Sequence, residues 1–342
     1  MSTNGWFDAF RENGDPAWFG DNRTPVVFDL QIYAIGAVFL IFLMAFLIVL
    51  PGIRYHKCAS ALCIFLSIFV GAVIMISLYH PNWHEGEVQI YAPFRAFSTE
   101  RMNAILGVKI GLKHANITLK GVPSHDNQIN KFDGLKYNER VELLNRVSMH
   151  EEQERSLRKG LPYPILKVIE YLSIDRGGFV WGRQYRLCGY YTYCLLWTAF
   201  ACWIVQIVLL CFVPHYFCVV TSVVGVLTIA ADLLYIVCLP KHLQIPFPSV
   251  NDSLAILELH LSTCFYLTLT AGVISTVFGI ILYYLETKTS YTLKTCMSCS
   301  TDECCAVQHK SKHCKYDFDE LTISVSPAST KCSNCPSLDQ RF

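Results

Sequence analysis

Five stretches of the chain are predominantly apolar and long enough to cross a lipid bilayer as helices. A helix rises about 1.5 Å per residue and must span roughly 30 Å of hydrocarbon, so about 20 residues suffice. None of the stretches contains Lys or Arg, and none alternates with the two-residue period of a barrel strand. We therefore predict five transmembrane α-helices, at residues 28–50, 59–79, 188–212, 216–239 and 255–285.

Composition indicates a membrane protein, and the distribution of basic residues predicts the orientation of the helices in the membrane. The 342 residues are 53% hydrophobic and only 16% charged, which is typical of a membrane protein. Basic residues of short loops favour the cytoplasm, and Arg54 and Lys57 lie in the short link after the first helix. The segments expected outside are then 1–27, 80–187 and 240–254, and those expected in the cytoplasm are 51–58, 213–215 and the tail 286–342.

Glycosylation acceptors give an independent check of this orientation. The sequence Asn-x-Ser/Thr begins at Asn22, Asn116 and Asn251, and all three positions fall in segments expected outside. We predict glycosylation at these three residues, with Asn116 the strongest candidate because Asn22 lies close to the membrane.

Residues 80–187 are expected to fold as an extracellular α+β domain. The stretch "GVKIGLKHANITLKG" (107–121) alternates apolar and polar residues on both sides of a turn at His114, which predicts an antiparallel hairpin. Lys109 and Lys113 are expected to face water. The side chains expected to face the domain core are Leu106, Val108, Ile110 and Leu112.

Helical periodicity follows the hairpin. Asn138 is a suitable N-cap for a helix over residues 139–159, and Gly160 with Pro162 is expected to end it. A second short helix is predicted at 164–172.

The 16 cysteines avoid residues 80–187 entirely. Cys188 and Cys238 lie near the outer ends of helices, where they could pair with each other or with a partner, or serve as small buried hydrophobes. In the tail, lipidation, a zinc site built on the two Cys-x2-Cys pairs, and plain disorder are all compatible with the spacing. The lipidation candidates are Cys296, Cys299, Cys304 and Cys305.

Motifs that would indicate an enzyme are missing from the sequence. There is no Gly-rich phosphate fingerprint and no Walker lysine, and the His150–Glu154 stretch has Glu where a zinc protease helix needs its second His. Asp232 is the one acid well inside a predicted membrane helix, with no basic residue at that depth to pair with it. We expect no catalytic activity, no cofactor or bound metal, no small-molecule substrate and no nucleic-acid partner.

The N-terminal stretch "GWFDAFRENGDPAWFG" (5–20) is too polar to cross a membrane and too short to bury its own aromatic side chains. Exposed aromatic residues are common anchors in protein interfaces, although those nearest the membrane also suit an interfacial belt. The candidate partner-binding residues are Trp6, Phe7, Phe10, Trp18 and Phe19.

Seven short segments together resemble the dual oxidase maturation factors. They are "LPGIR" (50–54), "FRAFS" (94–98), "GVKIGLKHANITLKG" (107–121), "KYNE" (136–139), "GLPYPILKVIEYL" (160–172), "GRQYRL" (182–187) and "HLSTCFYLTLTAG" (260–272). Their order and spacing match the family over residues 28–285.

This resemblance implies five helices with an external N-terminus and a claudin-like domain between the second and third helices. It implies a heterodimer with a dual oxidase, which such a factor carries out of the endoplasmic reticulum and accompanies to the plasma membrane, where the oxidase makes hydrogen peroxide. Phe179 and Val180 stand where vertebrate members carry a cysteine, and the tail resembles no vertebrate tail. A claudin-like adhesion or barrier protein is the alternative.

Overall fold

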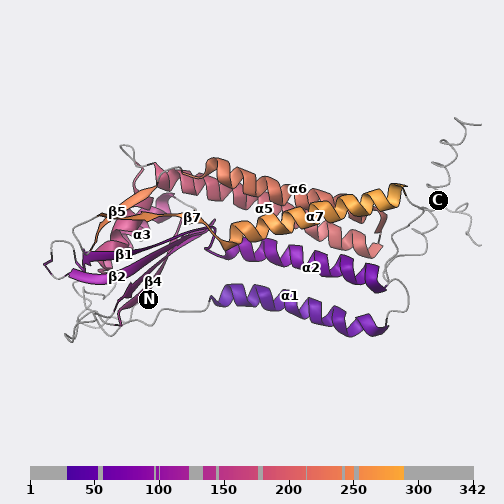
Figure 1. Ribbon diagram of the computed structural model, residues 1–342, viewed down its shortest axis with the longest axis horizontal. Coiled ribbons are helices and arrows are strands. Elements are labelled where there is room, and N and C mark those ends of the chain that lie inside the picture. The colour runs from indigo at the N-terminus through magenta and orange to yellow at the C-terminus, as the bar shows by residue number, and fades with distance from the viewer. Residues whose placement is uncertain are drawn as a thin grey trace, which may run out of the picture. The chain divides into compact units, whose positions relative to one another are not determined.

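The computed structural model describes most of the chain between the N-terminal segment and the tail (Figure 1). The described residues are 29–52, 57–95, 98–99, 101–122, 134–143, 146–175, 180–212, 214–240, 243–249 and 254–288. Five helices in these ranges are long and apolar enough to cross a membrane, as predicted. They are α1 (Leu30–Val49), α2 (Lys57–Tyr79), α5 (Trp181–Phe212), α6 (Pro214–Cys238) and α7 (Thr263–Lys288), with a short 3-10 turn, η2 (Leu50–Gly52), after α1.

The strands gather at one end of these long helices and form what we call the sheet domain (Figure 1). Its main sheet is antiparallel, with the strand order β4-β3-β2-β1-β7, and β5 and β6 form a separate pair. Two shorter helices, α3 (Arg146–Arg158) and α4 (Tyr163–Ser173), belong to the same domain. The strands are β1 (His84–Pro93), β2 (Arg101–Ile110), β3 (His114–Gly121), β4 (Lys136–Glu142), β5 (Gln244–Pro248), β6 (Leu254–Glu258) and β7 (His260–Leu261).

One face of the main sheet is buried beneath α4 and the β5–β6 pair. Leu106, Val108 and Ile110 are almost fully buried in this core, as their alternation with polar residues predicted. Leu112 is also buried, but it packs with Trp83 and Tyr235 in the cluster between the long helices. The β2–β3 hairpin therefore contributes side chains to both cores of the molecule.

The predicted helix at 139–159 is wrong in its first third. Residues 136–142 form β4, which pairs with β3 along its whole length, and α3 begins only at Arg146. Asn138 is therefore a strand residue rather than an N-cap, because pairing with a neighbouring strand overrides a local capping signal. The predicted end is confirmed, since Gly160 adopts the positive φ of 66° that favours glycine after a helix. The short helix predicted at 164–172 is also confirmed as α4.

The boundaries of two long helices also differ from the expected ones. Residues 254–258 and 260–261 are strands, so α7 starts at Thr263 rather than at 255. The apolar residues of β6 raised the hydropathy of that window although Leu257 is buried in the sheet domain. Helix α5 begins at Trp181, seven residues before the expected 188, and its first turns pack against α4.

Glycine permits the close contact between α4 and α5. A Cβ atom at Gly182 would lie 1.8 Å from the carbonyl oxygen of Leu172, so any side chain would push the two helices apart. Arg186, one turn further along α5, donates a hydrogen bond of 3.3 Å to the same carbonyl and pairs with Asp175 at 2.7 Å. These contacts give the "GRQYRL" segment a structural role, which is to hold α5 close against α4.

Substituting Ile110 tests whether the alternating face of β2 is the core face. Ile110→Asp buries an unpaired charge and should lower the free energy of unfolding by several kcal/mol, whereas Ile110→Val should cost only about 1 kcal/mol. Thermal unfolding of the purified protein in detergent measures both. Lys109→Gln, on the opposite face, is the matched control, and an equal loss in all three variants would contradict the assigned register.

Candidate functional site: the polar junction

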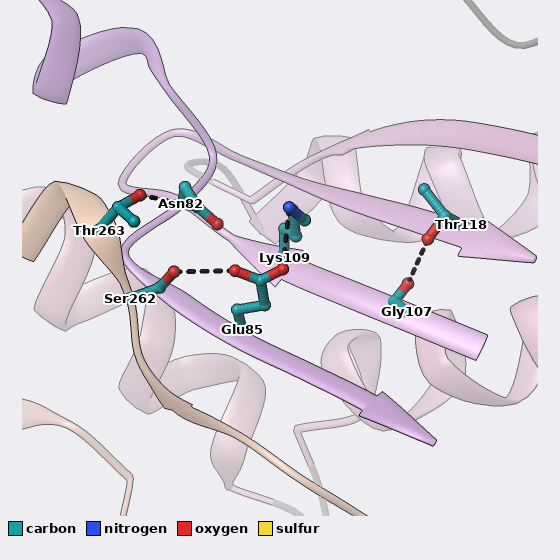
Figure 2. A network of polar contacts seen from close by, with 7 residues as sticks. All are labelled: Asn82, Glu85, Gly107, Lys109, Thr118, Ser262 and Thr263. Atoms are coloured by element: carbon teal, nitrogen blue, oxygen red, sulfur yellow. Dashed lines mark hydrogen bonds and ion pairs between the residues drawn. The ribbon is translucent and has the colours of Figure 1, made fainter. Parts of the chain in front are cut away.

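A network of polar contacts joins the main sheet to the ends of the long helices α2 and α7 (Figure 2). Glu85 of β1 pairs with Lys109 of β2 at 2.8 Å, and the hydroxyl of Ser262 donates a hydrogen bond to Glu85 at 2.8 Å. Burial opposes ionisation of Glu85, but the hydrogen bonds and charge of Lys109, with the Ser262 hydroxyl, outweigh it and hold the pKa of this carboxyl below its usual value. Glu85 is therefore a charged link between the two strands and the start of α7.

Main-chain hydrogen bonds reinforce the same junction. The amides of Ser262 and Cys264 donate to the carbonyls of Trp83 and Asn82 at 2.9 and 3.1 Å. The Asn82 side chain also donates to the hydroxyl of Thr263, the first residue of α7. The exit of α2 and the entry of α7 are thus joined to each other as well as to the sheet.

A row of residues in register crosses the polar face of the main sheet at this end. Glu85 lies opposite Lys109, Lys109 opposite Asn116, and Asn116 opposite Arg140. Arg140 then forms an ion pair with Asp29, whose side chain also accepts a hydrogen bond from the amide of Gln31 and so caps α1. The row ties the starts of α1 and α7 to opposite edges of one sheet.

Three histidine side chains are packed into the same region. The Nδ1 atom of His84 lies 2.6 Å from the hydroxyl of Tyr185 on α5. Burial, with the charge of His260 second, lowers the pKa of His84 to about 4. Burial, followed by the charge of Arg140, lowers the pKa of His114 to about 4, and burial lowers that of His80 as well. At neutral pH these imidazoles are uncharged packing groups.

Asn116 lies on β3, half-buried on the polar face of the sheet. Thr118, the hydroxyl residue of the same acceptor motif, donates to the carbonyl of Gly107 at 3.3 Å (Figure 2). The other acceptors, Asn22 and Asn251, the five N-terminal aromatic residues and the tail cysteines lie outside the described residues.

Cys188 and Cys238 are both free thiols in the structure. Cys188 is fully buried, and its thiol donates to the carbonyl of Tyr235 at 3.3 Å, so it joins α5 to α6 without a covalent bond. A disulfide between the two residues stays a prediction.

Asp232 is buried between α6 and α7, where the hydroxyl of Thr268 donates a hydrogen bond of 2.7 Å to its carboxyl. No Lys or Arg of the described residues forms an ion pair with it. Near it, Gly225 and Gly272 leave no room for a Cβ, since atoms of the facing helix lie 2.3 and 2.5 Å from where one would stand. The polar group thus belongs to a close helix–helix contact.

Sequence reasoning missed most of this junction. Ser262 and Thr263 stood inside a window that was expected to be transmembrane, and Asn82 and Glu85 carry no motif. Among the described residues, no group of three or more His, Cys, Asp or Glu side chains is arranged to hold a metal ion.

The fold and the junction define a membrane protein with five long apolar helices and a sheet domain fastened to them by structural polar contacts. A model of the dual oxidase maturation factor family matches residues 19–301, and the chain belongs to this family. Dual oxidase maturation factor 1 of Caenorhabditis elegans is 36% identical over 298 residues, which cover 84% of this chain and 75% of the relative. The human factor 1 is 31% identical over 277 residues (80% and 78%), and the human factor 2 is 29% identical over 295 residues (85% and 89%).

The buried histidines predict a loss of stability in mild acid. The pKa values of His84 and His114 are lower in the folded protein than the roughly 6.5 of an unfolded chain, so the unfolded chain binds more protons below that pH. The contribution of each neutral histidine to the free energy of unfolding is fully present above about pH 6.5 and is lost as the pH falls toward 4. The loss is on the order of 3 kcal/mol for each group.

Thermal unfolding in detergent between pH 7.5 and 4.5 measures this dependence. His114→Gln should flatten the pH profile, whereas Gln89→Asn, which changes an exposed side chain without a titratable group, should leave the shape of the profile unchanged. A profile that His114→Gln does not alter would show that the imidazole is not held neutral by the fold.

Proposed function

We propose that this protein is a non-catalytic maturation and partner subunit of a dual oxidase. It binds the oxidase as a heterodimer, supports its exit from the endoplasmic reticulum and accompanies it to the plasma membrane, where the oxidase makes hydrogen peroxide. The observation that carries the proposal is the family match over residues 19–301, which spans all five apolar helices and the whole sheet domain. The relatives' names state the role of maturation factor.

The proposed orientation places the N-terminal segment and the sheet domain outside and the tail in the cytoplasm. The basic residues Arg54 and Lys57 near the start of α2 and the acceptor Asn116 on the sheet domain support it. The sheet domain, formed by 80–187 together with 243–261, is the proposed claudin-like domain. In this orientation the two candidate disulfide cysteines lie toward the outer ends of α5 and α6, and the four candidate lipidation sites follow α7 in the cytoplasm.

Partner binding is assigned to two parts of the chain. The aromatic residues of the N-terminal segment are the proposed anchors outside the membrane. Helix α1 is the proposed contact within it, because its large apolar side chains are exposed and Phe46 alone is buried among its residues. Membrane lipids occupy the rest of its surface.

Co-expression with the cognate oxidase tests the proposal. We expect the oxidase to reach the cell surface and release peroxide with the wild-type chain or Ile110→Val, and to stay in the endoplasmic reticulum without the chain or with Ile110→Asp. Surface biotinylation and peroxide release measure this. Equal delivery without the chain would refute the maturation role, and lateral self-association in the absence of any oxidase would favour the adhesion protein.

Glycosylation of Asn116 tests the orientation separately. We expect Asn116→Gln to remove one glycan, seen as a loss of the corresponding mass shift after glycosidase treatment, because Asn116 lies on the face of the sheet opposite the core. Asn116→Gln with Asn22 and Asn251 intact isolates this site. An unmodified Asn116 in protein that reaches the surface would contradict an external sheet domain.

A further inference from the structure

The polar face of the main sheet is divided into two halves with different charge chemistry. The half next to the helices carries the paired charges described above, Glu85 with Lys109 and Asp29 with Arg140. The half away from the helices carries Arg101, Lys120 and Lys136, all exposed. None of these three forms an ion pair with an acidic side chain of the described residues.

Lys120 and Lys136 are direct cross-strand neighbours. They are opposite each other in the β3–β4 register. The hydrogen bonds from Gly121 to Leu135 and from Leu143 to Lys113 fix the phase of this ladder, so the two lysines form a non-hydrogen-bonded pair, in which side chains lie closest. Like charges directly opposite each other destabilise a sheet, and a bound anion would relieve that repulsion.

Among the described residues, the neighbours of the two lysines on the same face offer no such anion. In the sheet register, Ile105 of β2 lies opposite Lys120, and Gln89 of β1 lies opposite Ile105. The side-chain amide of Gln89 donates a hydrogen bond to the side chain of Asn103. Arg101, at the start of β2, lies over the ring of Tyr91 at 5.7 Å. Glu87, one row nearer to the helices, is the nearest acid in register on this face. We call Arg101, Lys120 and Lys136 the basic half of the sheet.

The N-terminal segment, residues 1–28, has the complementary charge and the reach to supply an anion. Its four acidic residues outnumber its two basic ones, Arg11 and Arg23. The acidic residues are Asp8, Glu12, Asp15 and Asp21. The segment joins the described chain at Asp29, which the ion pair with Arg140 holds at the edge of the same polar face.

The distances are short compared with the length of chain that is present. Lys136 is four residues from Arg140 along β4, which is about 13 Å at 3.3 Å per residue. Asp21 is eight residues before Asp29, and eight residues span up to about 26 Å when extended. Asp21 and Asp15 can therefore reach the basic half without strain on the anchor at Asp29.

We propose that the acidic residues of the segment 1–28 dock on the basic half of the sheet, with Asp15 and Asp21 against Lys120 and Lys136. The docked segment lies across the outer part of the sheet domain, starting from the anchor at Asp29. Its aromatic residues are then presented from a fixed surface, which reduces the entropy that a partner must overcome in ordering them. The docking itself needs no partner and does not rest on the proposed function.

A water-soluble carbodiimide tests the contact, because it joins a lysine amine to a carboxylate only when the two groups touch. The full-length protein is treated alone in detergent micelles, and cross-linked peptides are identified by mass spectrometry. We expect links from Lys120 or Lys136 to Asp15 or Asp21, and about a fivefold drop in their yield at high salt, as for two exposed ion pairs. Lys120→Gln with Lys136→Gln should abolish them, whereas Lys113→Gln, in the β2–β3 turn, should have no effect.

A charge exchange distinguishes docking from chance proximity. Lys120→Glu and Lys136→Glu together should abolish the links, and adding Asp15→Lys and Asp21→Lys should restore them with the amine and carboxylate exchanged. Two outcomes would overturn the proposal: no links between the basic half and the segment 1–28, and links that form only between copies carrying different isotope labels, which assign the face to a second copy. Because the measurement uses the chain alone, its result is independent of whether the chain delivers an oxidase.

Discussion

The structure depends on the hydrogen-bonded attachment of the sheet to the entry and exit points of the helices. Inside a bilayer, apolar helices gain little from contact with one another, because lipid tails are as apolar as their side chains. The main-chain bonds between Trp83 and Ser262 and between Asn82 and Cys264 hold α2 and α7 together at the point where both leave the sheet domain. The side chain of Trp83 is fully buried and packs against the ring of Tyr235.

The remaining helices are fastened at the same end by different means. Helix α5 meets the hairpin turn at Gly189, where a Cβ would lie 2.4 Å from the carbonyl of Leu112. Helix α1 has few buried side chains; it lies against α2, and the Asp29–Arg140 ion pair and the contact of Phe39 with Trp203 also hold it. The sheet domain therefore determines where the least buried helix begins, and α1 keeps an open apolar surface along most of its length.

The sequence predicted those parts of the structure that repeat a pattern over many residues. Five apolar runs gave five helices, and the alternation from Leu106 to Ile110 identified the buried face of β2. Local signals failed where a distant strand decided the outcome, as at Asn138 in β4 and at residues 254–261, which join the sheet domain instead of α7. The junction was not predictable because Glu85 and Ser262 are 177 positions apart, and only the folded chain brings them together.

The segments that carry the family resemblance coincide with these attachments. "GRQYRL" holds Gly182 and Arg186, which lock α5 to α4, and "HLSTCFYLTLTAG" holds Ser262 and Thr263, which start α7 on the sheet. Both segments are therefore explained by the joint between sheet and helices rather than by chemistry on a substrate. The proposed role would require two contact surfaces, one outside the membrane and one within it, to be held in a fixed relation. A joint made of close glycine contacts and a buried Arg186–Asp175 pair favours that rigidity, because the glycine contacts leave no space between the backbones and separating the ion pair would leave buried charges unpaired.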